Sequence, residues 1–311
     1  MLRRVAGRAA SRAGRSRPPN TGPLPSDCRF GGYQLGARIG RGGFGDVFAG
    51  EELSTGRQVA IKLQRADQRT ARIPVETEFL ASTAGAAGFP ALLWSGEAHG
   101  HHALVMARLG PSLKDMQQAQ GQLRAEALRT VSEHVLSRLR TMHELHWLHM
   151  DVKPANILLP APPPHGAEDW LRGQPEGFAM HLIDFGLSRK WWDSSSETYL
   201  PHTPRRGCIG TVRFASIANQ CARPIGRRDD LESLAYTLIF LRSGALPWSG
   251  VKAASKAERF QRMLDIKLRL SVEDVCTGFP TLAPFLHEVR AMHWDDRPDY
   301  DMLRKLLRRL G

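Results

Sequence analysis

Two short segments carry polar side chains whose spacing suits the transfer of a phosphoryl group. Residues 149–156 read His-Met-Asp-Val-Lys-Pro-Ala-Asn, and Asp184 opens an Asp-Phe-Gly triplet further along the chain. Asp151 can orient a hydroxyl as the catalytic base, and Asn156 and Asp184 offer the oxygen ligands that magnesium ions prefer. Lys153 lies two residues after Asp151, where its charge would stabilise the transferring group. The sequence therefore predicts a phosphotransferase centre.

A glycine-rich segment earlier in the chain suits the phosphates of a nucleotide. It lies between two predicted strands, and its small residues let backbone amides approach a phosphate closely. A dinucleotide-binding fold is the competing interpretation, but that fold requires a helix directly after the glycines, whereas a strand is predicted here. The residues predicted to contact ATP in this segment are Ile39, Gly40, Gly42, Gly43, Phe44, Gly45 and Val47.

Lys62 ends a Val-Ala-Ile-Lys motif on the next predicted strand, where its ammonium can pair with the α- and β-phosphates. A lysine on a half-buried strand needs an anionic partner. Glu76, fourteen residues later in a predicted helix, is the candidate, and Glu78 is a weaker second choice on another face. We therefore count Lys62 and Glu76 among the catalytic residues.

The elements that must position these residues fall into two groups. Before the Gly110-Pro111 pair, short β-branched and apolar runs predict an antiparallel sheet with one helix over Val75–Ala84. After it, apolar residues three and four apart predict helices. The predicted strands are Tyr33–Ile39, Asp46–Glu51, Gln58–Leu63, Leu92–Gly96 and His102–Met106, and the predicted helices are Arg124–His146, Arg228–Ser243, Ala254–Lys267 and Tyr300–Leu310.

This order predicts an α+β protein with a small sheet lobe over residues 33–106, a hinge over 107–110 and a larger, mainly helical lobe over 111–310. The Pro- and Gly-rich stretch 160–177 is predicted to be a surface loop between two short strands, because proline cannot donate to a strand ladder. Those strands are expected at Asn156–Leu159 and Met180–Ile183.

The formal net charge of +12 is unevenly spread. Residues 1–26 contain six Arg and no acidic residue, so we expect residues 1–28 to form either a disordered basic tail or a transit peptide for import into an organelle. Without import, we expect a protein of the cytoplasm, the nucleus or both. The remaining positive charge favours anionic protein partners, and no nucleic-acid partner is expected.

Other compositional features exclude several classes of site. The longest apolar stretch, Leu234–Leu241, is too short to span a membrane. The four cysteines show no paired spacing, which favours reduced thiols, and His143, His146 and His149 lack the context of a zinc site. We expect a monomer, and since the chain ends just after the last predicted helix, we expect no long C-terminal tail.

Several further segments resemble the casein kinase I family of protein kinases, and the resemblance covers residues 33–310. One of them reads Ala-Ser-Ile at the position where other kinases have Ala-Pro-Glu. The segments that carry the resemblance are Leu109–Asp115, Gly210–Ile217, Arg227–Leu234, Leu246–Gly250 and Asp295–Tyr300.

The resemblance implies a bilobal protein-kinase fold that uses ATP and Mg²⁺ and transfers phosphate to Ser or Thr in acidic or phosphate-primed protein substrates. It implies Met106 as gatekeeper, with Ala107 and Leu109 contacting adenine through their backbone, and it adds Ala60 and Asp115 to the ATP site. Arg213, Gly250 and Arg259 fall on its anion-binding positions, and Asp230 falls on a position that supports the catalytic loop.

Met150 departs from the pattern, because most kinases carry arginine there to sense a phosphate on the activation segment, which is Asp184–Ile217 in this chain. Ala218 and Ala235 also differ from the family. We expect Met150 to weaken dependence on that phosphate, which predicts constitutive activity. A catalytically weak pseudokinase that acts as a scaffold is the main alternative, and a small-molecule phosphotransferase is a third.

Overall fold

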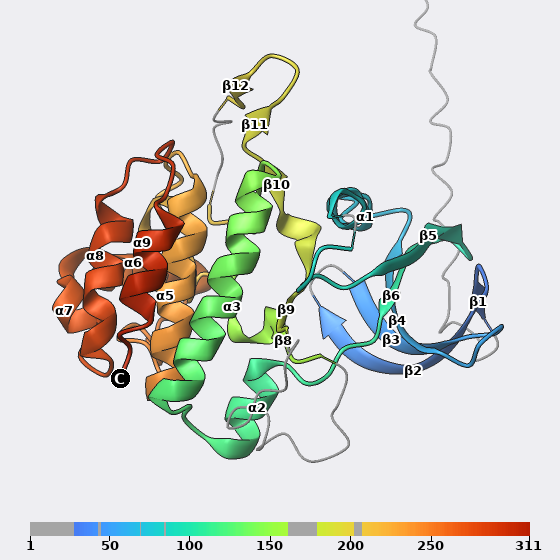
Figure 1. Ribbon diagram of the computed structural model, residues 1–311, viewed down its shortest axis with the longest axis horizontal. Coiled ribbons are helices and arrows are strands. Elements are labelled where there is room, and N and C mark those ends of the chain that lie inside the picture. The colour runs from blue at the N-terminus through green and yellow to red at the C-terminus, as the bar shows by residue number, and fades with distance from the viewer. Residues whose placement is uncertain (1–27, 43–44, 69, 84, 161–178, 202–206) are drawn as a thin grey trace, which may run out of the picture.

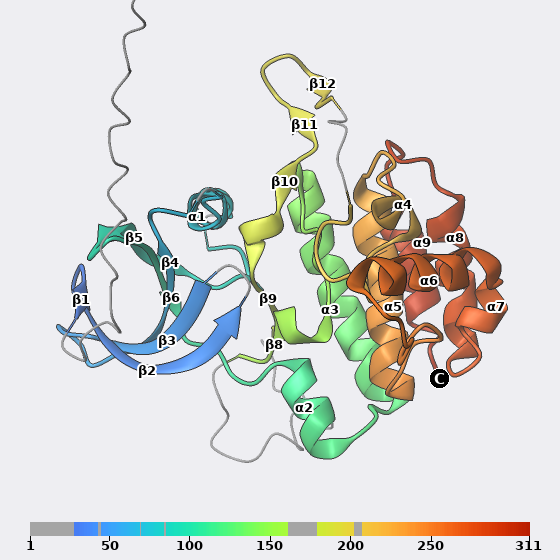
Figure 2. The same ribbon diagram turned by 180° about the vertical axis from the view of Figure 1, so that it is seen from behind.

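The computed structural model describes residues 28–42, 45–68, 70–83, 85–160, 179–201 and 207–311. They form a small lobe built on an antiparallel sheet and a larger lobe of helices (Figure 1). The view from behind shows the same division, with a hairpin projecting beyond the helices (Figure 2). This arrangement confirms the predicted α+β class with a sheet lobe first and a helical lobe second.

The small lobe is a six-stranded sheet with the order β1-β2-β3-β4-β6-β5. Side chains alternate between its faces, so Val59, Ile61 and Leu63 of β4 lie in one apolar cluster while Lys62 points to the opposite face. The strands are β1 (Arg29–Phe30), β2 (Tyr33–Gly42), β3 (Gly45–Glu52), β4 (Gln58–Arg65), β5 (Leu92–Ala98) and β6 (His101–Ala107).

The first residues of the sheet correct the predicted tail boundary. Cys28 was assigned to the tail, but it is buried in the same apolar cluster as Phe30, and its carbonyl oxygen accepts a hydrogen bond from Leu35 N (2.9 Å). β1 then pairs with β2, since Phe30 gains a fully buried position by extending the sheet. Residues 1–27, on which the tail and transit readings rest, lie outside the described residues.

Helix α1 (Ile73–Ser82) packs against the sheet face that carries Lys62. It begins two residues before the predicted start because Pro74 suits the first turn, where its missing amide costs nothing. The side-chain oxygen of Gln64 on β4 accepts hydrogen bonds from Arg72 N (2.7 Å) and Ile73 N (3.2 Å). The start of α1 is thereby fixed to the strand beside Lys62.

The large lobe is organised around α5, whose residues are buried along most of its length, and α3 packs along it. The four predicted helices are confirmed, with ends moved by up to three residues, whereas α2, α4, α7 and α8 were not predicted. The helices of this lobe are α2 (Leu113–Gln120), α3 (Ala125–Glu144), α4 (Ile217–Gln220), α5 (Arg227–Ser243), α6 (Lys256–Arg269), α7 (Val272–Val275), α8 (Ala283–Ala291) and α9 (Tyr300–Leu307).

Short paired strands surround the predicted catalytic segments. β8 (Ile157–Leu158) pairs with β9 (His181–Leu182), so the two predicted strands form but are shorter, and residues 161–178 between them lie outside the described residues. The remaining pairs are β7 (Trp147–Leu148) with β10 (Arg189–Lys190) and β11 (Trp192–Asp193) with β12 (Thr198–Tyr199). Among the helices of the described ranges, none has the length and apolar character needed to cross a bilayer.

Candidate active site

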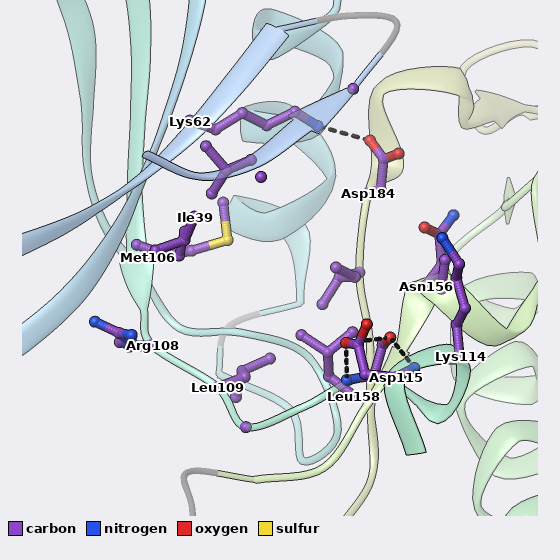
Figure 3. Close-up of a pocket in the computed structure, with 18 of the residues that line it drawn as sticks. Ile39, Lys62, Met106, Arg108, Leu109, Lys114, Asp115, Asn156, Leu158 and Asp184 are labelled. Carbon is purple, nitrogen blue, oxygen red and sulfur yellow. Dashed lines mark hydrogen bonds and ion pairs between the residues drawn. The ribbon is translucent and has the colours of Figure 1, made fainter. Parts of the chain in front are cut away.

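A cleft of about 430 Å³ lies between the two lobes, and both lobes contribute to its walls. Figure 3 shows Lys62 and Ile39 on the sheet side and Asn156 and Leu158 on the opposite side. Gly43 and Phe44 lie outside the described residues, but the other predicted ATP contacts all line this cleft. They are Ile39, Gly40, Gly42, Gly45, Val47, Ala60, Lys62, Met106, Ala107, Leu109 and Asp115.

Lys62 lies at the inner end of the cleft between two carboxylates. Its Nζ is 2.6 Å from Glu76 Oε2 on α1 and 2.6 Å from Asp184 Oδ1, the contact drawn as a dashed line in Figure 3. Burial opposes the charge of Lys62, but the two carboxylates outweigh it and raise its pKa, so the ammonium stays protonated. The predicted pairing of Lys62 with Glu76 is therefore present, whereas Glu78 pairs with Lys190 (2.6 Å).

Asp151 is buried at the start of the catalytic loop, with both carboxylate oxygens engaged. Oδ1 accepts a hydrogen bond from Thr211 N (2.7 Å), and Oδ2 is paired with Lys153 Nζ. Lys153 also donates to Thr211 Oγ1 (3.1 Å), and Asn156 Nδ2 donates to the carbonyl oxygen of Asp151 (2.9 Å). The three predicted loop residues thus form one network, and Thr211 joins it to the segment that follows.

The backbone of the catalytic loop is held in a strained conformation by Asp230 on α5. Met150 has φ of 71°, a left-handed value that costs a residue other than glycine about 1–2 kcal/mol. Asp230 compensates, since its two oxygens accept hydrogen bonds from His149 N (2.7 Å) and Met150 N (2.8 Å). His143 Nε2 lies 3.0 Å from the same carboxylate.

The histidine before Met150 links the loop to the Asp-Phe-Gly segment. His149 Nε2 lies 3.1 Å from the carbonyl oxygen of Ile183, and its Nδ1 accepts a hydrogen bond from Asp151 N (3.2 Å). Burial lowers the pKa of His149, which favours the neutral ring that this pattern requires, with the proton on Nε2. The sequence supplied no signal for this role beyond the position of His149 in the motif.

Phe185 connects α1 to the segment of Asp184, the predicted metal ligand. Its ring is fully buried, with its centroid 4.2 Å from that of Phe79 on α1 and 5.4 Å from that of His149. Asp184, just before it, has φ of 67° and turns its carboxylate toward Lys62. Burial would raise the pKa of Asp184, but the Lys62 ammonium lowers it below its ordinary range, so the carboxylate is charged and ready to bind a cation.

Asn156 and Asp184 suit magnesium. Both line the cleft, and because the Asn156 amide nitrogen donates to Asp151, the amide oxygen is the atom left for a ligand. The described residues contain no cluster of three or more His, Cys, Asp or Glu side chains that could hold a metal by themselves. Magnesium does not need one, since it is commonly held by one or two protein oxygens together with substrate phosphates and water.

The adenine end of the cleft contains residues that the sequence did not single out. Leu158 on β8 and Ile183 beside Asp184 line the helical-lobe side, and Arg108 and Lys114 lie at the mouth. Leu158 and Ile183 could have been found as apolar residues within two positions of the predicted metal ligands. Asp115 lines the same mouth, but its Oδ2 also accepts hydrogen bonds from Ser112 N (3.0 Å) and Oγ (2.7 Å) at the start of α2.

The three predicted anion-binding residues lie on segments that contact one another. Arg213 is half-buried, and its carbonyl oxygen accepts a hydrogen bond from Trp248 Nε1 (2.7 Å), two residues before Gly250. Arg259 is exposed on α6, which is held to α4 by Gln220 Nε2 and the carbonyl oxygen of Phe260 (2.8 Å). Within the described ranges neither arginine has a carboxylate partner, so both guanidinium groups remain available to an anion.

A comparison with known families agrees with this geometry. Residues 33–306 match the family model described as protein kinase domain, a match that runs from the start of β2 into α9 and takes in the cleft. Because the match covers most of the chain, the bilobal fold described above is a protein-kinase fold, and the chain belongs to the protein kinase family.

Proposed function

We propose that this chain is an active, ATP- and Mg²⁺-dependent Ser/Thr protein kinase that resembles the casein kinase I family. The observation that carries the proposal is the network around Asp151, in which Lys153 and Thr211 hold the carboxylate beside the cleft. A lysine two residues after the base favours Ser or Thr over Tyr as the acceptor, as the resemblance implies. The ion pair between Lys62 and Glu76 supports an active arrangement.

The proposed roles follow from the position of each group. Lys62 would orient the α- and β-phosphates of ATP. Asp151 would accept the proton of the Ser or Thr hydroxyl as the hydroxyl oxygen bonds to the γ-phosphorus, while the bond from that phosphorus to the β–γ bridging oxygen breaks and ADP leaves. Lys153 would stabilise negative charge on the transferring group. Magnesium held by Asn156 and Asp184 would supply charge neutralisation at the β- and γ-phosphates. Asp151 would act chiefly by orienting the acceptor hydroxyl rather than by its basicity, because phosphoryl transfer has a loose transition state.

The preference for acidic or phosphate-primed substrates is part of the proposal. Its support is the pair Arg213 and Arg259, whose planar guanidinium groups match phosphate oxygens and which have no carboxylate partner in the described part of the chain. Gly250 has φ of 72° and open space where a side chain would project, so an approaching anion meets no obstruction there.

Constitutive activity is proposed from the surroundings of Met150. Met150 is buried with Leu148 and Ile225, and Leu187, Trp191 and Ile209 of the activation segment pack against this cluster. Apolar contacts thus hold the segment at the point where most kinases use a phosphate and an arginine. Treatment with a phosphatase is expected to leave the rate unchanged, whereas a loss of more than half of the activity would contradict this part of the proposal.

The decisive experiment offers the purified full chain labelled ATP, Mg²⁺, casein and a phosphate-primed Ser peptide. Asp184→Asn is the matched control, because it keeps the size of the side chain but removes the negative charge. Incorporation into Ser or Thr well above that control is expected. Incorporation no higher than in the control would favour the alternative, a pseudokinase scaffold, for which Met150 is the motivating residue.

We further propose that the chain acts as a monomer in the cytoplasm or the nucleus, unless its basic N-terminal residues direct import into an organelle. Import is tested by fusing residues 1–28 to a fluorescent protein, with the six arginines replaced by glutamine in a control fusion. Organelle fluorescence that disappears in the control would support the transit peptide, and diffuse fluorescence in both would support the solvated tail.

A further inference from the structure

Lys267 near the end of α6 is completely buried, which is unusual for a lysine outside the ATP site. A buried ammonium is costly unless its protons are bound. No carboxylate of the described chain pairs with Lys267, since the nearby Glu232 is engaged by Tyr236 Oη (2.5 Å) and Arg290 (3.5 Å). Glu232 acts on the charge of Lys267 only from a distance, and the groups in direct contact with the ammonium are not acids.

Those groups are two backbone carbonyls and two aromatic rings. Lys267 Nζ donates to the carbonyl oxygens of Val212 (2.9 Å) and Ala215 (2.7 Å). It also lies 5.0 Å from the ring centroid of Trp248 and 5.3 Å from that of Tyr236, within the range of cation–π attraction. A compact ammonium with three protons suits this arrangement, because it can reach both carbonyls at once.

The carbonyls that Lys267 binds belong to the segment that contacts the catalytic loop. Thr211 bonds to Asp151 and Lys153, and Phe214 N and Ala215 N donate back to the Thr211 carbonyl oxygen (2.8 and 3.1 Å). The carbonyl oxygen of Arg213, which lies between Val212 and Ala215 in the sequence, accepts a hydrogen bond from Trp248 Nε1 (2.7 Å). Lys267 and Trp248 together thus fix carbonyls of a tight turn that begins directly after Thr211, the residue that touches Asp151.

We propose that Lys267 is a positioning residue for the protein substrate. By binding both ends of the turn over residues 212–215, it sets where Thr211 meets Asp151 and where Arg213 presents its guanidinium group. It touches neither the nucleotide nor the reacting atoms, so its effect should fall on the protein substrate rather than on ATP. This inference rests on the proposed kinase activity and adds a determinant of substrate binding to it.

Lys267→Met tests the proposal, because methionine keeps the unbranched chain and its contacts with Trp248 and Tyr236 but removes all three protons. The variant leaves the carbonyl oxygens of Val212 and Ala215 without this donor, so some loss of stability is expected and thermal unfolding is measured beside the kinetics. We expect the KM for the phosphorylated peptide to rise about tenfold or more and kcat to fall, with the KM for ATP within twofold of the wild type. Lys305→Met, an exposed lysine on α9, is the control and should change neither constant.

Hydrogen–deuterium exchange supplies a readout that does not depend on activity. The amides of Thr211, Phe214 and Ala215 should exchange faster in Lys267→Met, while those of α5 stay protected. If the wild type phosphorylated no substrate, the proposed function would fail, yet faster exchange confined to this turn would still support the role of Lys267. Unchanged exchange in the turn would overturn that role even in an active enzyme.

Lys267→Arg covers the case in which the methionine variant does not fold. Arginine keeps the charge but cannot place one nitrogen between the two carbonyls, so it should raise the KM for the peptide and leave the KM for ATP unchanged. Nucleotide binding and thermal unfolding establish that each variant is folded. A folded variant with a wild-type KM for the peptide, or with equal changes in both KM values, would refute the proposal.

Discussion

Met150→Arg restores the residue that most kinases carry, and the surroundings of Met150 predict that the change is harmful. Met150 is 5% exposed, in an apolar cluster with Leu148 and Ile225. Removing a buried methionine from that cluster forfeits about 1.5–3 kcal/mol of burial free energy. An arginine there adds a cost of about 1–3 kcal/mol if its guanidinium group lacks partners.

The long arginine side chain can relieve part of this cost by extending toward water. We therefore expect the free energy of unfolding to fall by about 3 kcal/mol, which lowers the melting temperature by about 6–12 °C. Activity should fall as well, because Ile209 packs on the cluster and lies two residues before Thr211, the residue that binds Asp151. We expect a decrease in kcat of about tenfold, which corresponds to an increase of about 1.4 kcal/mol in the activation free energy.

Thermal unfolding followed by tryptophan fluorescence measures the first effect, because Trp191 packs against the cluster. Steady-state kinetics with a protein substrate measures the second. Met150→Leu is the matched control, since a swap between apolar residues of similar volume costs less than about 1.5 kcal/mol. An arginine variant as stable as the wild type and equally active would refute the view that packing, rather than charge, is what Met150 supplies.

Three further changes test other parts of the site. Gly210→Ala adds a Cβ that would lie 2.4 Å from a catalytic-loop carbonyl oxygen at φ of 80°, so kcat should fall at least about tenfold while the Kd for ATP, measured by calorimetry, stays unchanged. Arg213→Ala and Arg259→Ala should each raise the KM for a primed peptide about tenfold and that for its unprimed form much less, and equal increases would contradict the anion site. Burial raises the pKa of Asp229 from 3.8 to about 7, so its contribution to stability is complete below pH 4 and is lost as the pH rises through 7. Asp229→Asn imitates the protonated acid. In urea unfolding, the loss of stability between pH 5 and pH 8 should therefore be about 3 kcal/mol smaller in this variant than in the wild type. An unchanged loss would show that Asp229 is not responsible.

Much of the fold was predictable because the signals are local. Alternating apolar residues on β4 place Lys62 on the face opposite the sheet core, and the spacing of apolar residues marks the long helices α3 and α5. Four helices escaped prediction. α4 and α7 are single turns of four residues, α2 buries only Leu113 and Met116, and α8 has a proline in its first turn, so none of them shows a clear helical period. The two-residue strand β1 escaped because it is likewise too short to establish a period, and only its pairing with β2 defines it.

The chemistry of the site follows a similar division. The residue types and spacings in the sequence determine that the chain carries Asp151, Lys153 and Asn156 in one segment and that Lys62 requires an acidic partner, because these are properties of neighbouring residues and of charge. Which residues contact these side chains was decided only by the tertiary structure, since the partners are distant in sequence. Thr211 binds Asp151 across 60 residues of chain, and Lys267 binds the turn that follows Thr211 from α6.

Met150 illustrates the difference. The sequence shows an arginine position filled by methionine, which is compatible with a lost switch or a lost activity. The fold places that methionine in an apolar cluster with the activation segment, and a thioether among apolar side chains is stabilised by burial where a guanidinium group would need an anion. The chemical type of each side chain is known from the sequence, but whether a given side chain is buried, paired or free depends on contacts that only the folded chain can make.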